Sequence, residues 1–253
     1  MGAGHGHHLH FHGHSPVHHL PAHLKLLALV GFVLTIVLTP RTAFPAYAVY
    51  LLLVLVAQRA SRVPFGYFAK RMVVEVPFVL FALLMPFVAT GPRVDVGPLR
   101  LSEHGLVGGF ALLAKGTLGV MASLVLATTT EPRHVVAGLE RLRLPGQLVQ
   151  IMGFMVRYLE VVTGELSRMK VARESRGFRA TSVRAWPVLA TTAGALFIRS
   201  YERGERAHLA MLSRGYTGSL PVTHPATATP AQWRLAGMLP AAALATLLVV
   251  VTR

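Results

Sequence analysis

The sequence predicts an all-α, polytopic membrane protein with about five transmembrane helices and a cytoplasmic coupling domain of amphipathic helices. Of the 253 residues, 53% are hydrophobic and only 14% are charged, whereas about a quarter of the residues in soluble domains are charged. The mean hydropathy is +0.53. The apolar residues gather in runs close to the length of about 20 residues that crosses a bilayer. The formal net charge is +15, an excess that membrane proteins typically keep on their cytoplasmic side.

Five apolar runs are candidate transmembrane helices. They are 24–39, 43–57, 73–90, 105–128 and 235–252. The first two are short and need their boundary residues to complete a span. A sixth span through 144–162 stays open as an alternative, because polar residues such as Gln150 and Arg157 interrupt that run.

The basic residues in the loops predict the orientation of these helices. The loop 58–72 is rich in Lys and Arg and has no acid, whereas 40–42 and 91–104 have fewer basic residues or offset them with acids. Basic loops stay in the cytoplasm. We therefore expect a multi-pass protein of the cell inner membrane, with a cytoplasmic N-terminus and an external C-terminus.

This orientation predicts four regions. They are a His-rich flexible N-terminal tail (1–23), transmembrane helices 1 to 4 (24–128), cytoplasmic coupling helices (129–234) and the last transmembrane helix (235–253). The apolar runs 144–162 and 188–198 in the cytoplasmic region are expected to be amphipathic helices that lie against the membrane and against each other.

A repeat lies within the cytoplasmic region. Residues 168–178 and 206–216 both read R-x-x-x-A-x-x-S-R-G-[FY], at an offset of 38 residues. The matched pairs are Arg168 and Arg206, Ala172 and Ala210, Ser175 and Ser213, Arg176 and Arg214, Gly177 and Gly215, and Phe178 and Tyr216. Arg, Ala and Ser at i, i+4 and i+7 share one helix face, and Gly directly after the second Arg suits a helix C-terminus. Each repeat is therefore predicted to be a helix that ends in an arginine, followed by a tight turn and an aromatic residue.

Two interpretations of the terminal arginines are open. An arginine in the last turn interacts favourably with the helix dipole, or it can anchor a helix at the membrane surface. The duplication favours recognition instead, because two equivalent helix ends suit a partner with two equivalent binding sites.

On these residues the chain resembles the transmembrane T subunit of energy-coupling factor (ECF) transporters, most closely the cobalt/nickel branch. The resemblance includes SPVHHLPAHLKLLALVGFVLTIVLTP near the start, RYLEVVTGELSRMKVARESRGF and SYERGERAHLAMLSRGYTG. That family has two Ala-Arg-Gly-type signatures at the ends of two crossed coupling helices, and their arginines insert into grooves on two ATP-binding subunits. Here Ser175 and Ser213 replace the alanines. Pro21-Ala22-His23 replaces the Asp-Pro-Arg that the branch often has, while Lys25 remains.

The resemblance implies a transmembrane coupling or scaffold subunit of an ATP-driven importer of cobalt or nickel ions. Its partners would be two ATP-binding cassette subunits, a separate substrate-binding membrane subunit for Co²⁺ or Ni²⁺, and the lipid bilayer, with no nucleic acid. The residues that would bind the ATPase subunits are Ser175, Arg176, Gly177, Ser213, Arg214 and Gly215. Supporting positions on the coupling helices would be Arg168, Ala172, Phe178, Arg206, Ala210 and Tyr216. The sequence has no G-x-x-x-x-G-K-[ST] motif, so we expect no ATPase, no other enzyme and no cofactor.

Two other functions are weighed against this one. A stand-alone secondary metal-ion carrier would have inverted repeats and paired intramembrane charges, whereas this repeat is direct and predicted to be cytoplasmic. A membrane metalloenzyme would have acids or histidines clustered at one depth in several spans, and the sequence does not indicate such a cluster.

Histidines near the N-terminus are candidate metal ligands. They are His5, His7, His8, His10, His12 and His14. Neutral imidazoles can bind Ni²⁺, Co²⁺ or Zn²⁺, but an incidental flexible tail has the same composition, so both interpretations stay open.

Lys115 lies inside the predicted span 105–128, where a charge is costly and by default indicates function. The alternatives are snorkelling to the membrane surface and pairing with Glu75. Four acids of the coupling region accompany arginines and are expected to form ion pairs on helices. They are Glu160, Glu165, Glu202 and Glu205.

Overall fold

A computed structural model describes residues 15–90, 92–96, 99–178, 185–218 and 228–252. The chain divides into two compact units. One comprises residues 9–138 and 226–253, and the other includes residues 139–225. The boundary between them falls within helix α6 (Pro132–Arg141).

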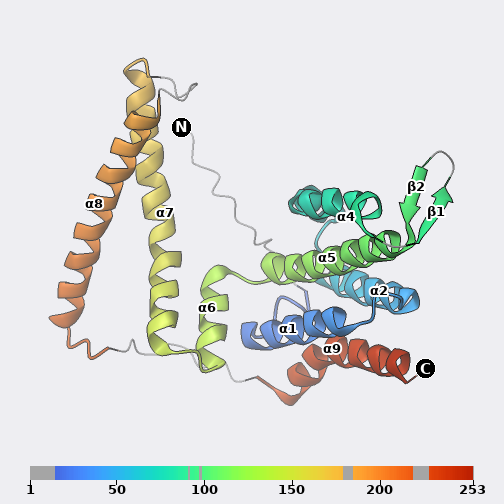
Figure 1. Cartoon of the computed structure of the whole chain (residues 1–253). Coiled ribbons are helices and arrows are strands. Elements are labelled where there is room, and N and C mark those ends of the chain that lie inside the picture. The colour runs from blue at the N-terminus through green and yellow to red at the C-terminus, as the bar shows by residue number, and fades with distance from the viewer. Residues whose placement is uncertain (1–14, 91, 97–98, 179–184, 219–227, 253) are drawn as a thin grey trace. The chain divides into compact units, whose positions relative to one another are not determined.

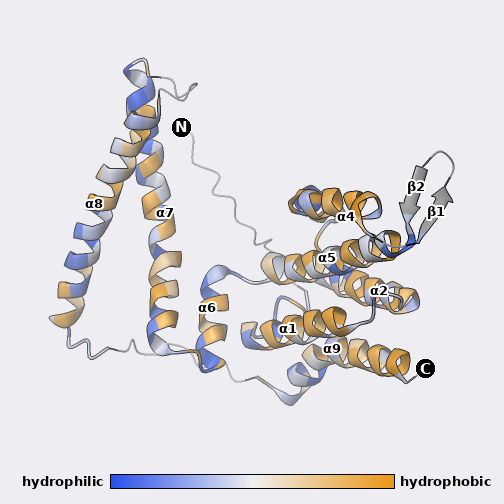
Figure 2. Ribbon diagram, in the orientation of Figure 1, coloured by the Kyte–Doolittle hydropathy of each residue, from blue (hydrophilic) through white to orange (hydrophobic). Residues whose placement is uncertain are grey.

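The first unit is a bundle of mostly apolar helices (Figures 1 and 2). Its helices are α1 (Ala22–Leu38), α2 (Phe44–Ser61), α3 (Phe65–Arg71), the 3₁₀ helix η1 (Met72–Glu75), α4 (Val76–Val88), α5 (Glu103–Thr129) and α9 (Pro230–Val251). Helices α1 and α2 both pack against α5 and α9, and α4 packs against α5. The core of the bundle includes Phe32 and Tyr50, whose rings meet edge to face at 6.1 Å. Many large apolar side chains point outward, as expected of a surface that faces lipid.

The predicted fold class is confirmed, with four helical segments in the described part of the chain that are long and apolar enough to cross a membrane. They are Phe44–Ser61, Gly66–Val88, Glu103–Thr129 and Pro230–Val251. The expected span 24–39 forms α1, an apolar helix of 17 residues. At 1.5 Å per residue α1 is about 25 Å long, somewhat less than the bilayer hydrocarbon core of about 30 Å.

The third candidate span contains a break that the sequence did not predict. Between α3 and α4 the backbone tightens into η1, and Pro77 occupies the first turn of α4. A 3₁₀ turn inside a helical span often marks a hinge. The break places the buried Glu75 against α5, where the hydroxyl of Thr117 donates to its carboxylate.

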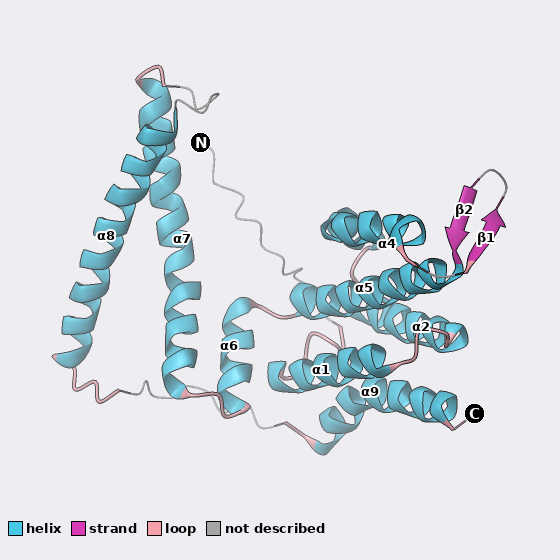
Figure 3. Cartoon of the chain, viewed as in Figure 1, coloured by secondary structure: helices cyan, strands magenta, loops and turns pink. Residues whose placement is uncertain are grey.

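A short hairpin departs from the otherwise helical fold (Figure 3). Strands β1 (Arg93–Val96) and β2 (Leu99–Ser102) pair antiparallel, with Arg93 opposite Ser102. The sequence analysis treated this stretch as a loop. Ser102 is the N-cap residue of α5, since its hydroxyl accepts the backbone N–H of Gly105 at 3.3 Å.

Lys115 does not pair with Glu75 in the described structure but contacts the end of α1. Its Nζ donates to the carbonyl oxygens of Val37 and Thr39, each at 2.8 Å. The last carbonyls of a helix have no partner within the helix, and a cation at this end also complements the helix dipole. The lysine therefore caps the short helix α1 from α5.

The second unit consists mainly of two long helices, α7 (Gly146–Ser175) and α8 (Trp186–Leu212), which run antiparallel as a hairpin (Figure 1). Each continues an expected amphipathic run directly into the repeat that follows it. The sequence analysis had separated these apolar runs from the repeats. Neither helix has an apolar stretch long enough to be a candidate membrane span, and both mix polar and apolar residues along their length (Figure 2).

Candidate functional site

The first repeat ends α7 in a Schellman motif. The N–H of Phe178 donates to the carbonyl of Arg173 at 3.1 Å, and the N–H of Gly177 donates to that of Glu174 at 3.0 Å. Gly177 has a φ of +78°, a left-handed conformation that favours glycine. The backbone thus turns away directly after Arg176, whose side chain is exposed at the helix end.

The second repeat ends α8 in the same way. The N–H of Tyr216 donates to Met211 at 3.1 Å, and that of Gly215 donates to Leu212 at 3.0 Å. The φ of Gly215 is +82°. The structure therefore places Arg214 at the position that Arg176 occupies in α7, as the alignment of the repeats predicts.

The serines of the two repeats also make matching contacts. The hydroxyl of Ser175 donates to the carbonyl of Ala172, and that of Ser213 donates to that of Ala210, both at 3.0 Å. The matched positions of both helix faces are exposed: Arg168, Ala172, Ser175, Arg206, Ala210 and Ser213. The face that the repeat pattern defines is therefore accessible within the described part of the hairpin.

Each arginine-tipped end is hydrogen-bonded to the other helix, near the N-terminus of that helix. In the last turn of α7, Nη1 of Arg173 donates to the hydroxyl of Thr192 in α8 at 3.0 Å. The same guanidinium lies 6.0 Å from the ring centroid of Phe178. After α8, the hydroxyl of Tyr216 donates to Oε1 of Gln150 in α7.

The two arginine-tipped ends lie at opposite ends of the hairpin, because α7 and α8 are antiparallel. Helix α8 has 27 residues, which corresponds to a length of about 40 Å. A partner that contacts both arginines must therefore be extended or must consist of two bodies.

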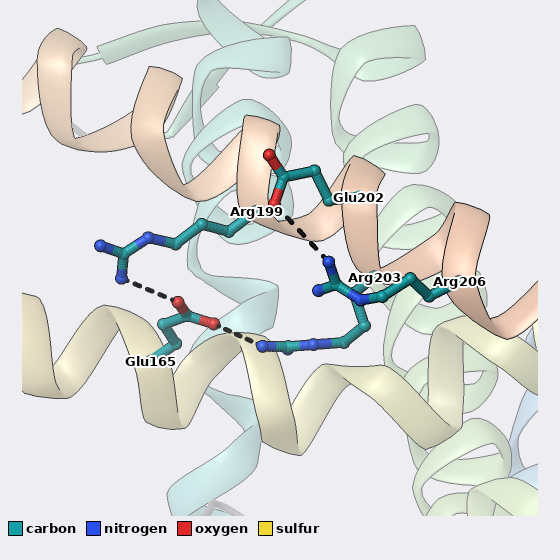
Figure 4. A network of polar contacts seen from close by, with 5 residues as sticks. All are labelled: Glu165, Arg199, Glu202, Arg203 and Arg206. Carbon is teal, nitrogen blue, oxygen red and sulfur yellow. Dashed lines mark hydrogen bonds and ion pairs between the residues drawn. The ribbon is translucent and has the colours of Figure 1, made fainter.

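An ion-pair cluster connects the middle of the two helices (Figure 4). The carboxylate of the buried Glu165 accepts from Arg199 and from Arg203, each at 3.1 Å. The hydrogen bond from Arg199 and that from Arg203 hold the pKa of Glu165 below its ordinary value, although burial acts in the opposite direction. The sequence analysis expected ion pairs along single helices. Arg206 and Glu202 form such a pair at 3.8 Å, whereas Glu165 pairs across the hairpin.

Residues 13–225 match the family described as CbiQ, cobalt transport protein. The chain belongs to the CbiQ family. It is 27% identical over 225 residues to the energy-coupling factor transporter transmembrane protein EcfT of Listeria innocua, covering 81% of this chain and 82% of that protein. The EcfT of Bacillus subtilis is 28% identical over 223 residues, covering 81% of this chain and 82% of that protein. An uncharacterized protein of Methanocaldococcus jannaschii is 25% identical over 210 residues, covering 79% of this chain and 71% of that one.

This CbiQ-family chain is thus an EcfT-type transmembrane component of an ECF transporter and a multi-pass membrane protein. It is a non-catalytic component, as the sequence analysis expected. The names of the relatives do not specify a metal.

The histidines proposed as metal ligands, at positions 5 to 14, lie outside the residues that the structure describes. Within the described ranges, no three or more His, Asp or Glu side chains come together in a way that could hold a metal ion.

The sequence analysis did not predict the residues that hydrogen-bond the arginine-tipped ends of this CbiQ-family chain to the opposite helix. Arg173 lies inside the repeat at a position that the second repeat does not match, since Met211 stands there. Gln150 was considered only as a polar interruption of an apolar run. A glutamine in such a run is itself a signal, because a polar side chain on an apolar face needs a partner.

Proposed function

We propose that this protein is the scaffold of an ATP-driven importer of cobalt or nickel ions. In this function it transmits the motion of two ATP-binding cassette subunits to a separate membrane subunit that binds the metal ion. The proposal also includes the orientation inferred from the loops, with the α7–α8 hairpin in the cytoplasm. The cobalt description of the CbiQ family supports the choice of substrate.

The observation that supports this function best is the identical construction of the two arginine-tipped ends. Arg176 and Arg214 each follow the last turn of a long helix and precede a glycine with positive φ. A guanidinium presents several donors in a fixed plane, which suits carboxylates and carbonyls at the edge of a groove. Since the Schellman motif fixes the backbone of each end, little conformational freedom is lost when a partner binds.

The hairpin also has the construction that a transmitting element requires. The Glu165 cluster joins the helices near their middle, and the contacts of Arg173 and Gln150 join them near each end. A motion applied at one end therefore moves both helices together instead of bending one of them.

The test is copurification of the ATP-binding subunits with the assembled transporter. Changing both Arg176→Glu and Arg214→Glu should leave the membrane bundle folded but release the ATPases or uncouple hydrolysis from metal uptake. Truncation of one partner in a buried charged pair costs about 2–5 kcal/mol, and charge reversal should cost more. Lysine at both positions should be a partial defect, because it keeps the charge and loses the planar fork.

Arg157→Glu is the matched control. Arg157 is exposed on α7 outside the repeat, and exposed charges contribute up to about 1 kcal/mol. Equal loss of ATPase from the Arg157 variant and from the Arg176 and Arg214 variants would mean that general positive charge binds the partners. The proposed recognition would then be wrong. Uptake of Co²⁺ and Ni²⁺, each supplied alone to membranes of the wild type, decides which ion is imported.

A further inference from the structure

One end of the helical bundle contains a cavity that opens to the surface, since lining residues such as Val56, Ala60 and Ala242 are exposed. The cavity, of about 340 Å³, lies among α1, α2, α5 and α9, and the segment around Pro16 and Val17 completes its wall. Its volume falls in the range of small-molecule binding sites. Further along the same four helices the core is filled by large side chains, including Tyr47, Tyr50 and Met121.

The wall of the cavity is almost entirely apolar. Six small residues line it: Ala28, Ala57, Ala60, Ala122, Ala236 and Ala242. Small residues in membrane bundles usually let two helices approach closely, but here they leave a space. Among the described residues that line the space, only Lys25 and Thr129 have polar side chains. A water molecule needs two to four polar partners, so an apolar occupant fits the cavity better than water.

The polar corner of the cavity lies at a boundary of the bundle. Nζ of Lys25, in the first turn of α1, donates to the carbonyl of Thr129 at 2.9 Å and to Oγ1 of Thr130 at 3.0 Å, where α5 ends. It also lies 3.4 Å from the carbonyl oxygen of His18. These acceptors are neutral, and no acid is among the described residues of the cavity wall. The charge of the ammonium group is therefore not neutralised by this wall.

Further basic residues stand at the same end of the bundle. They are Arg59 and Arg62 where α2 ends, Arg133 after α5 and Arg234 near the start of α9. Each is exposed. Glu131 partly offsets them, since it pairs with Arg133 at 3.2 Å. The cavity is therefore apolar where the candidate spans line it, and its one polar corner is positively charged.

We propose that this cavity binds one acyl chain of an anionic phospholipid, whose phosphate lies beside Lys25 and the surrounding arginines. The apolar lining matches the chain, and the positive end matches the headgroup. A bilayer supplies such a lipid at the level where basic residues are attracted to anionic headgroups. The lipid would replace side-chain packing at this end of the bundle.

The test uses the full chain, purified in detergent and stripped of lipid. Phosphatidylglycerol or phosphatidylcholine is added, and native mass spectrometry measures what the protein retains. We expect one phospholipid per chain, phosphatidylglycerol being preferred, and a higher melting temperature with phosphatidylglycerol than with phosphatidylcholine. A wild-type protein that retains only detergent, or that treats both lipids alike in both measurements, would overturn the proposal.

Two matched pairs of variants locate the lipid. Ala242→Phe fills the cavity and should abolish retention, whereas Ala245→Phe, which is exposed on the same helix and does not line the cavity, should retain the lipid. Lys25→Met should lower the preference for phosphatidylglycerol about fivefold, the value expected for one basic residue near an anionic surface. Lys70→Met, which removes an exposed charge from α3, should not. Retention by Ala242→Phe equal to that of the wild type would contradict the site. If Ala242→Phe does not fold, the wild-type comparison of the two lipids still decides the question.

Discussion

Glu165 and Arg203 lie at equivalent positions, three residues before the first and second repeats, and they bind each other: Nη2 of Arg203 lies 3.1 Å from Oε2 of Glu165. Equivalent residues of two copies meet only where the axis that relates the copies passes between them. The repeat in the sequence therefore corresponds to an approximate two-fold arrangement of α7 and α8. In this arrangement the two arginine-tipped ends occupy equivalent positions.

Low pH should loosen this contact. Because the pKa of Glu165 is held below its ordinary value of 4.5 by its arginine partners, its ionised form stabilises the folded hairpin. That contribution is complete above about pH 4.5 and is lost as the pH falls through the lowered pKa. Spin labels on Ser167→Cys and Ala193→Cys can measure the interhelical distance, since the chain has no native cysteine. The distance distribution should broaden below pH 4.5 in the wild type.

Glu165→Gln should broaden that distribution already at neutral pH, because two guanidinium groups then face a neutral amide. Glu160→Gln is the control, since Glu160 is exposed on the same helix. If the Glu165 and Glu160 variants gave the same distribution, the Glu165 cluster would not hold the helices together.

Tyr216→Phe should loosen the second arginine-tipped end and leave the first intact. The change gives the second repeat the same aromatic residue as the first, but it removes the hydrogen bond to Gln150. A hydrogen bond of this kind contributes about 0.5–1.5 kcal/mol net. Amide hydrogen exchange at Tyr216 and Gly218 should therefore accelerate up to about tenfold. Tyr201→Phe, at an exposed tyrosine of α8, should leave these rates unchanged, and an equal effect of both variants would argue against the contact.

The glycines after the arginines should not tolerate β-branched residues. Gly177 and Gly215 have positive φ, and a Cβ at either position would meet no other atom within 4 Å. Any loss on substitution would thus arise from backbone conformation, at about 1–2 kcal/mol. Valine should fray the last turn of each helix, and asparagine should be milder because it adopts the left-handed region more readily.

Gly204→Ala provides the comparison for the glycine variants. Gly204 lies within α8, and a Cβ there would also meet nothing within 4 Å. Alanine at this position should stabilise the helix by up to about 1 kcal/mol. Thermal unfolding of the three single variants measures the difference, and a Gly177→Val or Gly215→Val variant as stable as the wild type would exclude a structural role for the left-handed turn.

Reporter fusions test the proposed orientation. A reporter fused after Arg253 should be active outside the cytoplasm, and one inserted near Gly218 should be active inside. Placement of both on one side would change the number of spans by one. It would also show whether α1, which is shorter than the other candidate spans, crosses the membrane.

The sequence predicts the features of this fold that depend on local chemistry. The apolar runs locate the bundle helices, and the Arg-Gly-aromatic pattern predicts both Schellman ends, because a left-handed C-terminus favours glycine. Contacts between distant residues could not be predicted in this way. Lys115 caps α1 from another helix, and Glu75, at the break in the third candidate span, accepts a hydrogen bond from Thr117 of α5. Neither residue has a partner within the reach of a local pattern.

The Glu165 contact lies equally far from both arginines. Arg176 follows Glu165 by 11 residues, and Arg214 follows Arg203 by 11 residues. Each tip is therefore about 16 Å along its helix from the contact, which lies midway between the two tips. If two partners bind the two tips as proposed, neither partner lies nearer than the other to this contact. Equal forces on the two tips would then load the Glu165 contact equally.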